Sequence, residues 1–161
     1  MWIEVLDETG RFRRRERLRE VVARVARAVG CPAGGSLTIV LADDATIAER
    51  NARDRGVAGP TDVLAYPTAE PDDVGVPRVP HLGDVWISLD TAARQARGQR
   101  PTWHEVSVLA AHALLHLRGF DHGDAAAWAP FEAVQDLAET EAKAVDQGRS
   151  LRALLAARST A

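Results

Sequence analysis

Three histidines are the residues whose types and spacing most clearly predict chemistry. His112, His116 and His122 follow the pattern HxxxHxxGxxH within the segment HALLHLRGFDH. Side chains four residues apart on a helix lie on one face, with Cβ atoms about 5 to 6 Å apart, so the first two can share one ion. Gly119 favours a left-handed helix end, after which the chain can turn back and supply the third imidazole. Three protein ligands leave one coordination position open, which is typical of a catalytic zinc ion.

Two alternatives stay open at these histidines. A histidine on an apolar helix can be a hydrogen-bonded core residue, although here three of only five histidines follow the metal-binding pattern. Three imidazoles also suit nickel, copper or iron, so the spacing predicts a metal site with zinc as the preferred ion. The other two, His81 and His104, have no ligand partner at metal spacing, and we expect them to be exposed or to cap helices.

The residue after the first histidine argues against one class of zinc enzyme. Zinc proteases with this spacing carry a glutamate there that acts as the general base, and this chain has Ala113. Alanine cannot accept a proton, so the peptidase mechanism lacks its base. A phosphodiester fits such a site better, because a metal ion and a nearby arginine can stabilise the charge of its transition state. Asp121 is open to two interpretations, as an orienting residue or base and as an ordinary turn residue.

The elements that must position these residues follow from hydrophobic periodicity. Alternating and β-branched runs predict strands at 2–6, 36–41, 63–66 and 84–89. Helical spacing predicts helices at about 13–29, 43–53, 90–97, 102–117 and 124–145. Residues 67–81 are predicted to be an irregular loop, and 151–157 a loosely packed helix. This succession is typical of an α+β fold with a small mixed sheet of about four strands packed with helices.

The histidine helix is predicted to be central and buried, in a zincin-like arrangement. Thr102 is expected to cap its start, with Glu105 completing a capping box. Apolar residues surround it: Trp103, Val106, Leu109, Ala110, Ala113, Leu114 and Leu117. The following helix carries a stripe that we expect to be core: Trp128, Phe131, Val134 and Leu137. Burial fixes the imidazoles, provided that their second nitrogens find hydrogen-bond acceptors.

Composition bounds the class of protein. The 161 residues predict a single domain over 1–148, with a tail at 149–161. One cysteine, no signal-like N-terminus and no long apolar run predict a soluble cytoplasmic protein without a membrane partner. A net charge of −3 does not indicate a general nucleic-acid-binding surface, and the arginines at 11–19 are expected to form a solvated face with Glu16 and Glu20 as partners.

Three blocks of the chain resemble one family in order. HALLHLRGFDH at 112–122 resembles the HGxLHLxGYDH signature of the YbeY family, bacterial endoribonucleases of rRNA maturation. NARDRGVAGPTDVLAYP at 51–67 is similar to the family's LNxxYRxKxxPTDVLSFP, and LGDVWISLDTA at 82–92 to its LGDIxIsxxxA strand. The resemblance spans most of residues 36–137.

The resemblance implies a zinc-dependent endoribonuclease, specific for single-stranded RNA, acting in 16S rRNA 3' end maturation and ribosome quality control. It implies one Zn²⁺ ion on His112, His116 and His122, and Arg55 and His112 as catalytic residues, with Arg55 holding the substrate phosphate. The implied partners are the small ribosomal subunit and its precursor rRNA, together with a small-subunit protein and a ribosome-associated GTPase.

Four positions depart from the family pattern: Asp54 for tyrosine, Val57 for lysine, Ala65 for serine and Ala113 for glycine. The first two reduce the positive charge around Arg55, which predicts a change in RNA affinity or substrate range. Two rival functions stay open, a zinc metallohydrolase of the protease type and a ribosome assembly factor whose metal is structural.

Overall fold

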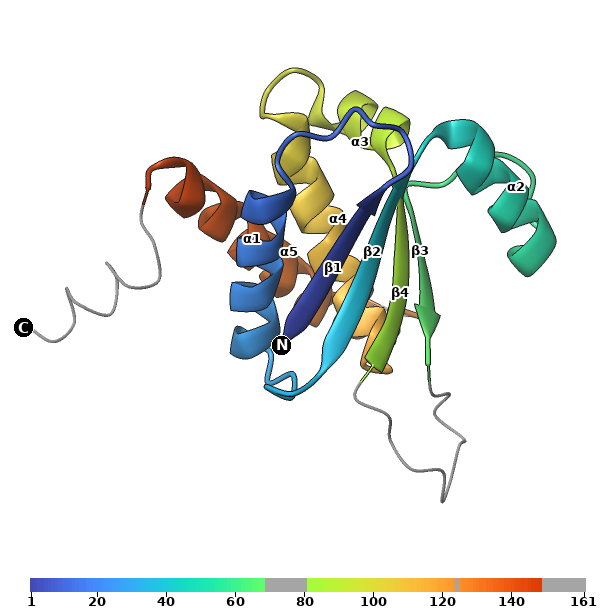
Figure 1. Ribbon diagram of the computed structural model, residues 1–161. Helices are drawn as coiled ribbons and strands as arrows, with labels where there is room; N and C mark the ends of the chain where they lie inside the picture. The colour runs from blue at the N-terminus through green and yellow to red at the C-terminus, as the bar shows by residue number, and fades with distance from the viewer. Residues whose placement is uncertain (69–80, 124, 149–161) are drawn as a thin grey trace, which may run out of the picture.

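The sheet is mixed and four-stranded, as predicted. The computed structural model describes residues 1–68, 81–123 and 125–148 (Figure 1). Its strands are β1 (Trp2–Asp7), β2 (Ser36–Ala42), β3 (Val63–Pro67) and β4 (His81–Ser88), in the order β1-β2-β4-β3. β1 and β4 both run parallel to β2, whereas β3 pairs antiparallel with β4 and forms an edge of the sheet.

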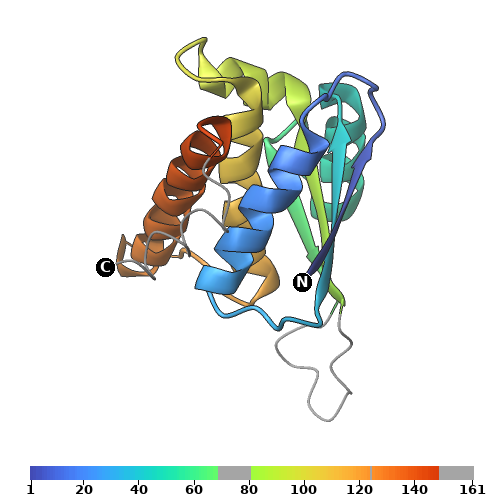
Figure 2. The ribbon, with the colours of Figure 1, turned by 60° about the vertical axis from the view of Figure 1, so that its left-hand side comes forward.

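Helices cover the two faces of the sheet unequally. They are α1 (Arg15–Ala28), α2 (Asp44–Arg55), α3 (Leu89–Ala96), α4 (Thr102–Leu117) and α5 (Ala125–Asp146). Figure 2 shows α1, α4 and α5 together on one side of the sheet. Alternate strand residues such as Ile39 and Val85 face these helices and join the main core. A smaller cluster on the opposite face packs Ile47 of α2 against Leu64.

The histidine helix α4 lies at the centre, as its apolar surroundings predicted. It packs against α1, α3, α5, β3 and β4. After Thr102 at its start, only His112 and His116 are partly exposed, and every other residue of α4 is buried. Beyond Thr102, therefore, the only residues of α4 that reach solvent are the two histidines.

The predicted capping box at the start of α4 is wrong. The N-cap residue is Pro101, which makes no side-chain cap, and Thr102 is already helical. Glu105 is buried and forms an ion pair with Arg100 instead. A buried carboxylate is costly unless it is paired, so the cation wins over the backbone amide that a capping box would use.

Burial also differs from expectation at three further positions. His104, expected to be exposed or to cap a helix, is buried, with Nε2 2.7 Å from Asp146 Oδ2 of α5. Helical spacing from Val21 and Val25 predicts that Ala28 is also buried in α1, but Ala28 is exposed and Ala26 is buried instead. Trp128, expected in the core, keeps 36% of its surface exposed.

Several helices and strands begin or end a few residues away from their predicted bounds. α1 begins at Arg15, two residues later than expected, α2 extends two residues further to Arg55, and β4 begins at His81, three residues earlier. Most of the predicted loop at 67–81, and the predicted tail with its helix at 151–157, lie outside the described residues. Among the described helices, none is long and apolar enough to cross a membrane.

Candidate metal centre

The structure brings the three predicted ligands together. One nitrogen from each of His112, His116 and His122 lies within 4.8 Å of the other two. The ring centroids form a nearly equilateral triangle with sides of 4.9, 5.0 and 5.2 Å. The Nε2 atoms of His112 and His116 are 3.1 Å apart. Two ligands at 2.0 to 2.1 Å from a tetrahedral zinc lie about 3.3 Å apart, so this spacing fits such an ion.

The end of α4 places the third histidine. Gly119 has φ of +85° just beyond the C-cap residue Arg118. Its N–H donates to the carbonyl of His116, and the next N–H, of Phe120, donates to that of Leu115. This pair of bonds is the Schellman motif, which reverses the chain at a left-handed residue. The turn returns His122 to the first two imidazoles, as the glycine predicted.

The two imidazoles on α4 are held in the neutral form that binds metal. Burial first, and then positive charge on His116 and His122, lowers the pKa of His112 to about 4. Burial likewise lowers the pKa of His116, with the charge of His122 as the next cause. Neutral imidazole offers a lone pair to a metal ion, whereas imidazolium does not.

The same two histidines have partners for their second nitrogen. His116 Nδ1 lies 3.1 Å from the carbonyl oxygen of Phe120, in the turn that Gly119 makes. His112 Nδ1 lies 2.8 Å from the carboxamide nitrogen of Gln135 on α5. Such contacts set the tautomer and the orientation of a ligating ring. His116 therefore has the expected acceptor at its second nitrogen, whereas the atom that faces Nδ1 of His112 is the donor nitrogen of a side chain from another helix.

Two aromatic residues of α5 pack on the triad. The Phe131 ring centroid lies 4.7, 4.8 and 4.7 Å from those of His112, His116 and His122, and Phe131 is fully buried. It therefore closes one side of the histidine triangle. The Trp128 ring meets His122 edge to face, with centroids 4.4 Å apart, and stacks on Phe131 with rings 17° from parallel. Trp128 thus gives the site an exposed aromatic border.

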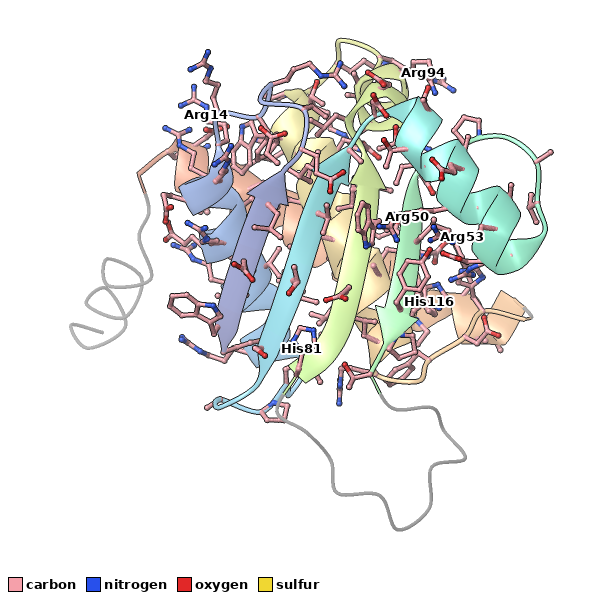
Figure 3. The ribbon with its side chains drawn as sticks, turned by 45° about the vertical axis from the view of Figure 1, so that its right-hand side comes forward. Arg14, Arg50, Arg53, His81, Arg94 and His116 are labelled. Atoms are coloured by element: carbon pink, nitrogen blue, oxygen red, sulfur yellow. The ribbon has the colours of Figure 1, made fainter. Side chains whose placement is uncertain are left out.

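Arg55, the predicted phosphate-binding residue, lies close to this centre. It is the last residue of α2 and is exposed, and its Nη2 donates to the Ala65 carbonyl of β3 over 3.1 Å. Its positive charge is among the causes that lower the pKa of His116. In Figure 3, Arg53 of α2 and His116 both lie beside β3, whereas Arg14 lies at the other side of the sheet.

The α2–β3 connection is held by a buried amide. Asn51 is 6% exposed, and its Nδ2 donates to the carbonyl of Gly59 over 2.9 Å. At the end of α2, Gly56 adopts the left-handed conformation, with φ of +67°. These two features fix the loop that follows Arg55 and thereby the position of that arginine beside β3.

Asp121 is exposed and accepts from the neighbouring backbone N–H of His122 over 2.8 Å. This bond favours the interpretation as a turn residue. Ala113 is fully buried, so the position that carries the base in zinc proteases faces the core.

Sequence reasoning missed the contribution of α5 to the site. It assigned Phe131 only to the core and did not single out Gln135. The available signal was the position of Gln135, a polar residue four after Phe131 and therefore on the same helical face. A polar residue on an inward-facing stripe indicates a buried hydrogen bond.

The chain is similar to proteins of one family. A family model described as Endoribonuclease YbeY matches residues 4–142. A relative of that name from Thermus thermophilus is 43% identical over 121 residues, which cover 74% of this chain and 85% of the relative. Another, from Parvibaculum lavamentivorans, is 40% identical over 131 residues, covering 74% and 70%. The resemblance inferred from three sequence blocks is thus confirmed.

A solved structure has the same fold. The solution structure of TM1509 from Thermotoga maritima matches with a TM-score of 0.64, over 91% of this chain and 92% of that one. The two sequences are 23% identical, so this similarity supports the α+β architecture.

Proposed function

Because the chain belongs to the endoribonuclease YbeY family, we propose that it is a zinc-dependent endoribonuclease that cleaves single-stranded RNA. The observation that supports this proposal best is the convergence of three imidazoles beside the exposed Arg55. The resemblance of the three sequence blocks extends the proposal to a substrate, the 3' end of precursor 16S rRNA. It also extends it to ribosome quality control on the small subunit, in the cytoplasm.

His112, His116 and His122 would hold the ion. Zinc bound there would polarise a phosphate oxygen and lower the pKa of a coordinated water, which makes hydroxide available near neutral pH. The protein contributes a pre-formed set of donors, because α4, the turn at Gly119 and the ring of Phe131 fix all three rings. Pre-formed donors need little reorganisation when the ion binds.

Arg55 would bind the phosphate. Its bond to the Ala65 carbonyl holds the guanidinium against the edge strand β3, near enough to His116 for its charge to lower the pKa of that histidine. A guanidinium carries five N–H donors in a planar fork, and that bond engages one nitrogen. Arg55 can therefore donate to phosphate oxygens while β3 holds it in place, and it can stabilise the charge that develops during cleavage.

Peptide hydrolysis fits the site less well. Ala113 offers no proton acceptor and is fully buried. Phosphodiester cleavage can proceed when a metal ion and a guanidinium stabilise the phosphate. The absence of the glutamate therefore argues against a peptidase more strongly than against a nuclease.

The direct test measures cleavage of single-stranded RNA by the purified protein, with and without chelator. We expect activity that chelator abolishes and added Zn²⁺ restores, together with accumulation of unprocessed 16S rRNA 3' ends in a depleted strain. Arg55→Ala should lower kcat/KM by about 100-fold without changing zinc content. Arg14→Ala, which removes an exposed arginine at the other side of the sheet, should stay close to wild type (Figure 3).

Each rival function has its own result. Chelator-sensitive cleavage of an unstructured protein such as casein, without RNA cleavage, would support the metallohydrolase of the protease type. A His112→Ala variant that is inactive on RNA but rescues a deletion strain would support an assembly factor. RNA cleavage that survives both chelator and His116→Ala would refute the metal mechanism.

A further inference from the structure

The two ligands on α4 are held at their second nitrogens by partners of different kinds. His116 Nδ1 faces the Phe120 carbonyl at 3.1 Å, and a carbonyl can only accept. The proton of His116 is therefore fixed on Nδ1, and Nε2 keeps its lone pair for an ion. His112 lies one helical turn earlier, where the backbone carbonyls belong to the helix itself. Its orientation must come from a side chain, and the side chain that contacts Nδ1 belongs to Gln135, at 2.8 Å.

Gln135 is well placed to hold this ring. It is half-buried on α5, one helical turn after Phe131, whose ring packs on all three histidines. The His112 imidazole is thus contacted at Nδ1 by Gln135, while its Nε2 points toward Nε2 of His116, 3.1 Å away. These contacts leave the ring little freedom to turn Nε2 out of the triad.

A carboxamide can serve either tautomer of this imidazole. Its NH₂ group donates to a bare Nδ1, and after a half-turn of the amide its carbonyl oxygen accepts from a protonated Nδ1. A ligand that binds metal through Nε2 carries its proton on Nδ1, so the carbonyl oxygen is the atom that supports binding.

We propose that Gln135 is a positioning residue of the metal centre, accepting the Nδ1–H of His112 and keeping Nε2 directed toward His116 and His122. This inference rests on the proposed metal function. It assigns to α5 a part in metal affinity, in addition to its packing against α4.

The test separates metal affinity from stability. Zinc affinity is measured by competition with a chromophoric chelator, and unfolding by urea in excess chelator, for three variants. Gln135→Met keeps the length of the side chain without a strong acceptor, and Gln135→Glu keeps an acceptor. Glu132→Met, on an exposed position of the same helix, is the matched control.

We expect Gln135→Met to bind Zn²⁺ at least about tenfold more weakly than wild type, because partners of ligating histidines carry effects of this size. Gln135→Glu should bind at least as tightly as wild type, since a carboxylate accepts more strongly, and Glu132→Met should match wild type. If Gln135→Met lowered folding stability, the comparison between wild type and Gln135→Glu would still test the acceptor.

Three results would overturn the proposal. Wild-type zinc affinity in Gln135→Met would mean that Gln135 only packs. Equal weakening in Gln135→Glu would mean that acceptance of the proton is not its role. A wild-type protein that binds no Zn²⁺ would refute the metal function itself, and the inference with it, and this last result is distinguishable because it does not depend on the variants.

Discussion

The pH dependence of the unfolding free energy, measured on chelator-treated protein, tests whether His112 is neutral in the folded protein. Burial is the main cause that lowers the pKa of His112 from 6.5 to about 4, followed by charge on His116 and His122. The unfolded chain keeps the ordinary value of about 6.5. Between these values the unfolded chain binds a proton that the folded protein excludes. The stability that depends on neutral His112 is therefore fully present above about pH 6.5, the pKa in the unfolded chain. It is lost as the pH falls from there to about 4.

The size of this loss of stability follows from the shift in the pKa of His112. The difference between 6.5 and about 4, at about 1.4 kcal/mol per pKa unit, predicts that unfolding free energy falls by about 3 kcal/mol at pH 4. His116, whose pKa is lowered too, adds in the same direction. A typical domain is stable by only about 5 to 15 kcal/mol, so the loss is a large fraction of the total. Asp44, with a pKa lowered to about 2, affects stability only at more acidic pH.

Urea unfolding followed by tryptophan fluorescence, at about pH 7, 6, 5 and 4, measures this directly. His112→Gln removes the titrating ring and should lose about 3 kcal/mol less than wild type over that interval. His81→Gln, on β4 and in contact with Ser36 and Asp84, is a control that should retain the wild-type loss. Added Zn²⁺ should raise stability at neutral pH, and this gain should shrink with acid because protons compete for the same nitrogens.

Identical pH dependence in wild type and His112→Gln would refute the reasoning, because it would mean that His112 titrates alike in the folded and unfolded chains. A loss confined to pH below about 4 would point instead to the carboxylates. Either result would also remove the argument that the fold holds this ligand in its neutral form.

Two further substitutions test the surroundings of the site. A Cβ at Gly83, whose φ is +145°, would overlap the backbone oxygen of Tyr66, so Gly83→Ala should destabilise by about 3 kcal/mol and lower Tm by about 6 to 12 °C. Gly98→Ala, with φ of +67° but nothing within 4 Å, should cost only about 1 kcal/mol in the same thermal melt, and an equal cost would show that the overlap relaxes. Trp128→Ala should weaken single-stranded RNA binding by about tenfold in fluorescence anisotropy, because base stacking on an aromatic ring contributes about 1 to 3 kcal/mol. Trp2→Ala, at a 74% exposed position on β1, is its control, and equal losses would contradict a stacking role for Trp128.

The fold could be predicted from sequence wherever periodicity was strong. Alternation in β1 and the continuous apolar surround of α4 each indicate one element type, and both predictions are confirmed. The predicted capping box is absent because it was inferred from a local sequence pattern, whereas the interaction that replaces it depends on tertiary packing. Glu105 is buried by tertiary packing, and its pairing with Arg100 outweighs the backbone amide it was expected to reach.

The histidine triad could be predicted because its three residues lie within eleven positions, so one helix and one turn bring them together. The supporting residues could not be predicted in the same way. Gln135 and Phe131 reach His112 only because α5 docks on α4, and that docking is set by the core as a whole rather than by the histidine motif. A stripe of apolar residues predicts that a helix packs, but it does not identify the residues that it contacts.

Asp54 shows how a departure from the family pattern acts through its neighbours. The sequence predicted that this aspartate would reduce the positive charge around Arg55. Its carboxylate accepts from Arg53 over 2.6 and 3.0 Å and from the Tyr66 hydroxyl over 2.7 Å, and these bonds lower its pKa to about 2. The negative charge is therefore paired with Arg53, while Arg55 is held by the Ala65 carbonyl. Any loss of RNA affinity should arise at Arg53, at the border of the site, and leave the proposed phosphate contact of Arg55 intact.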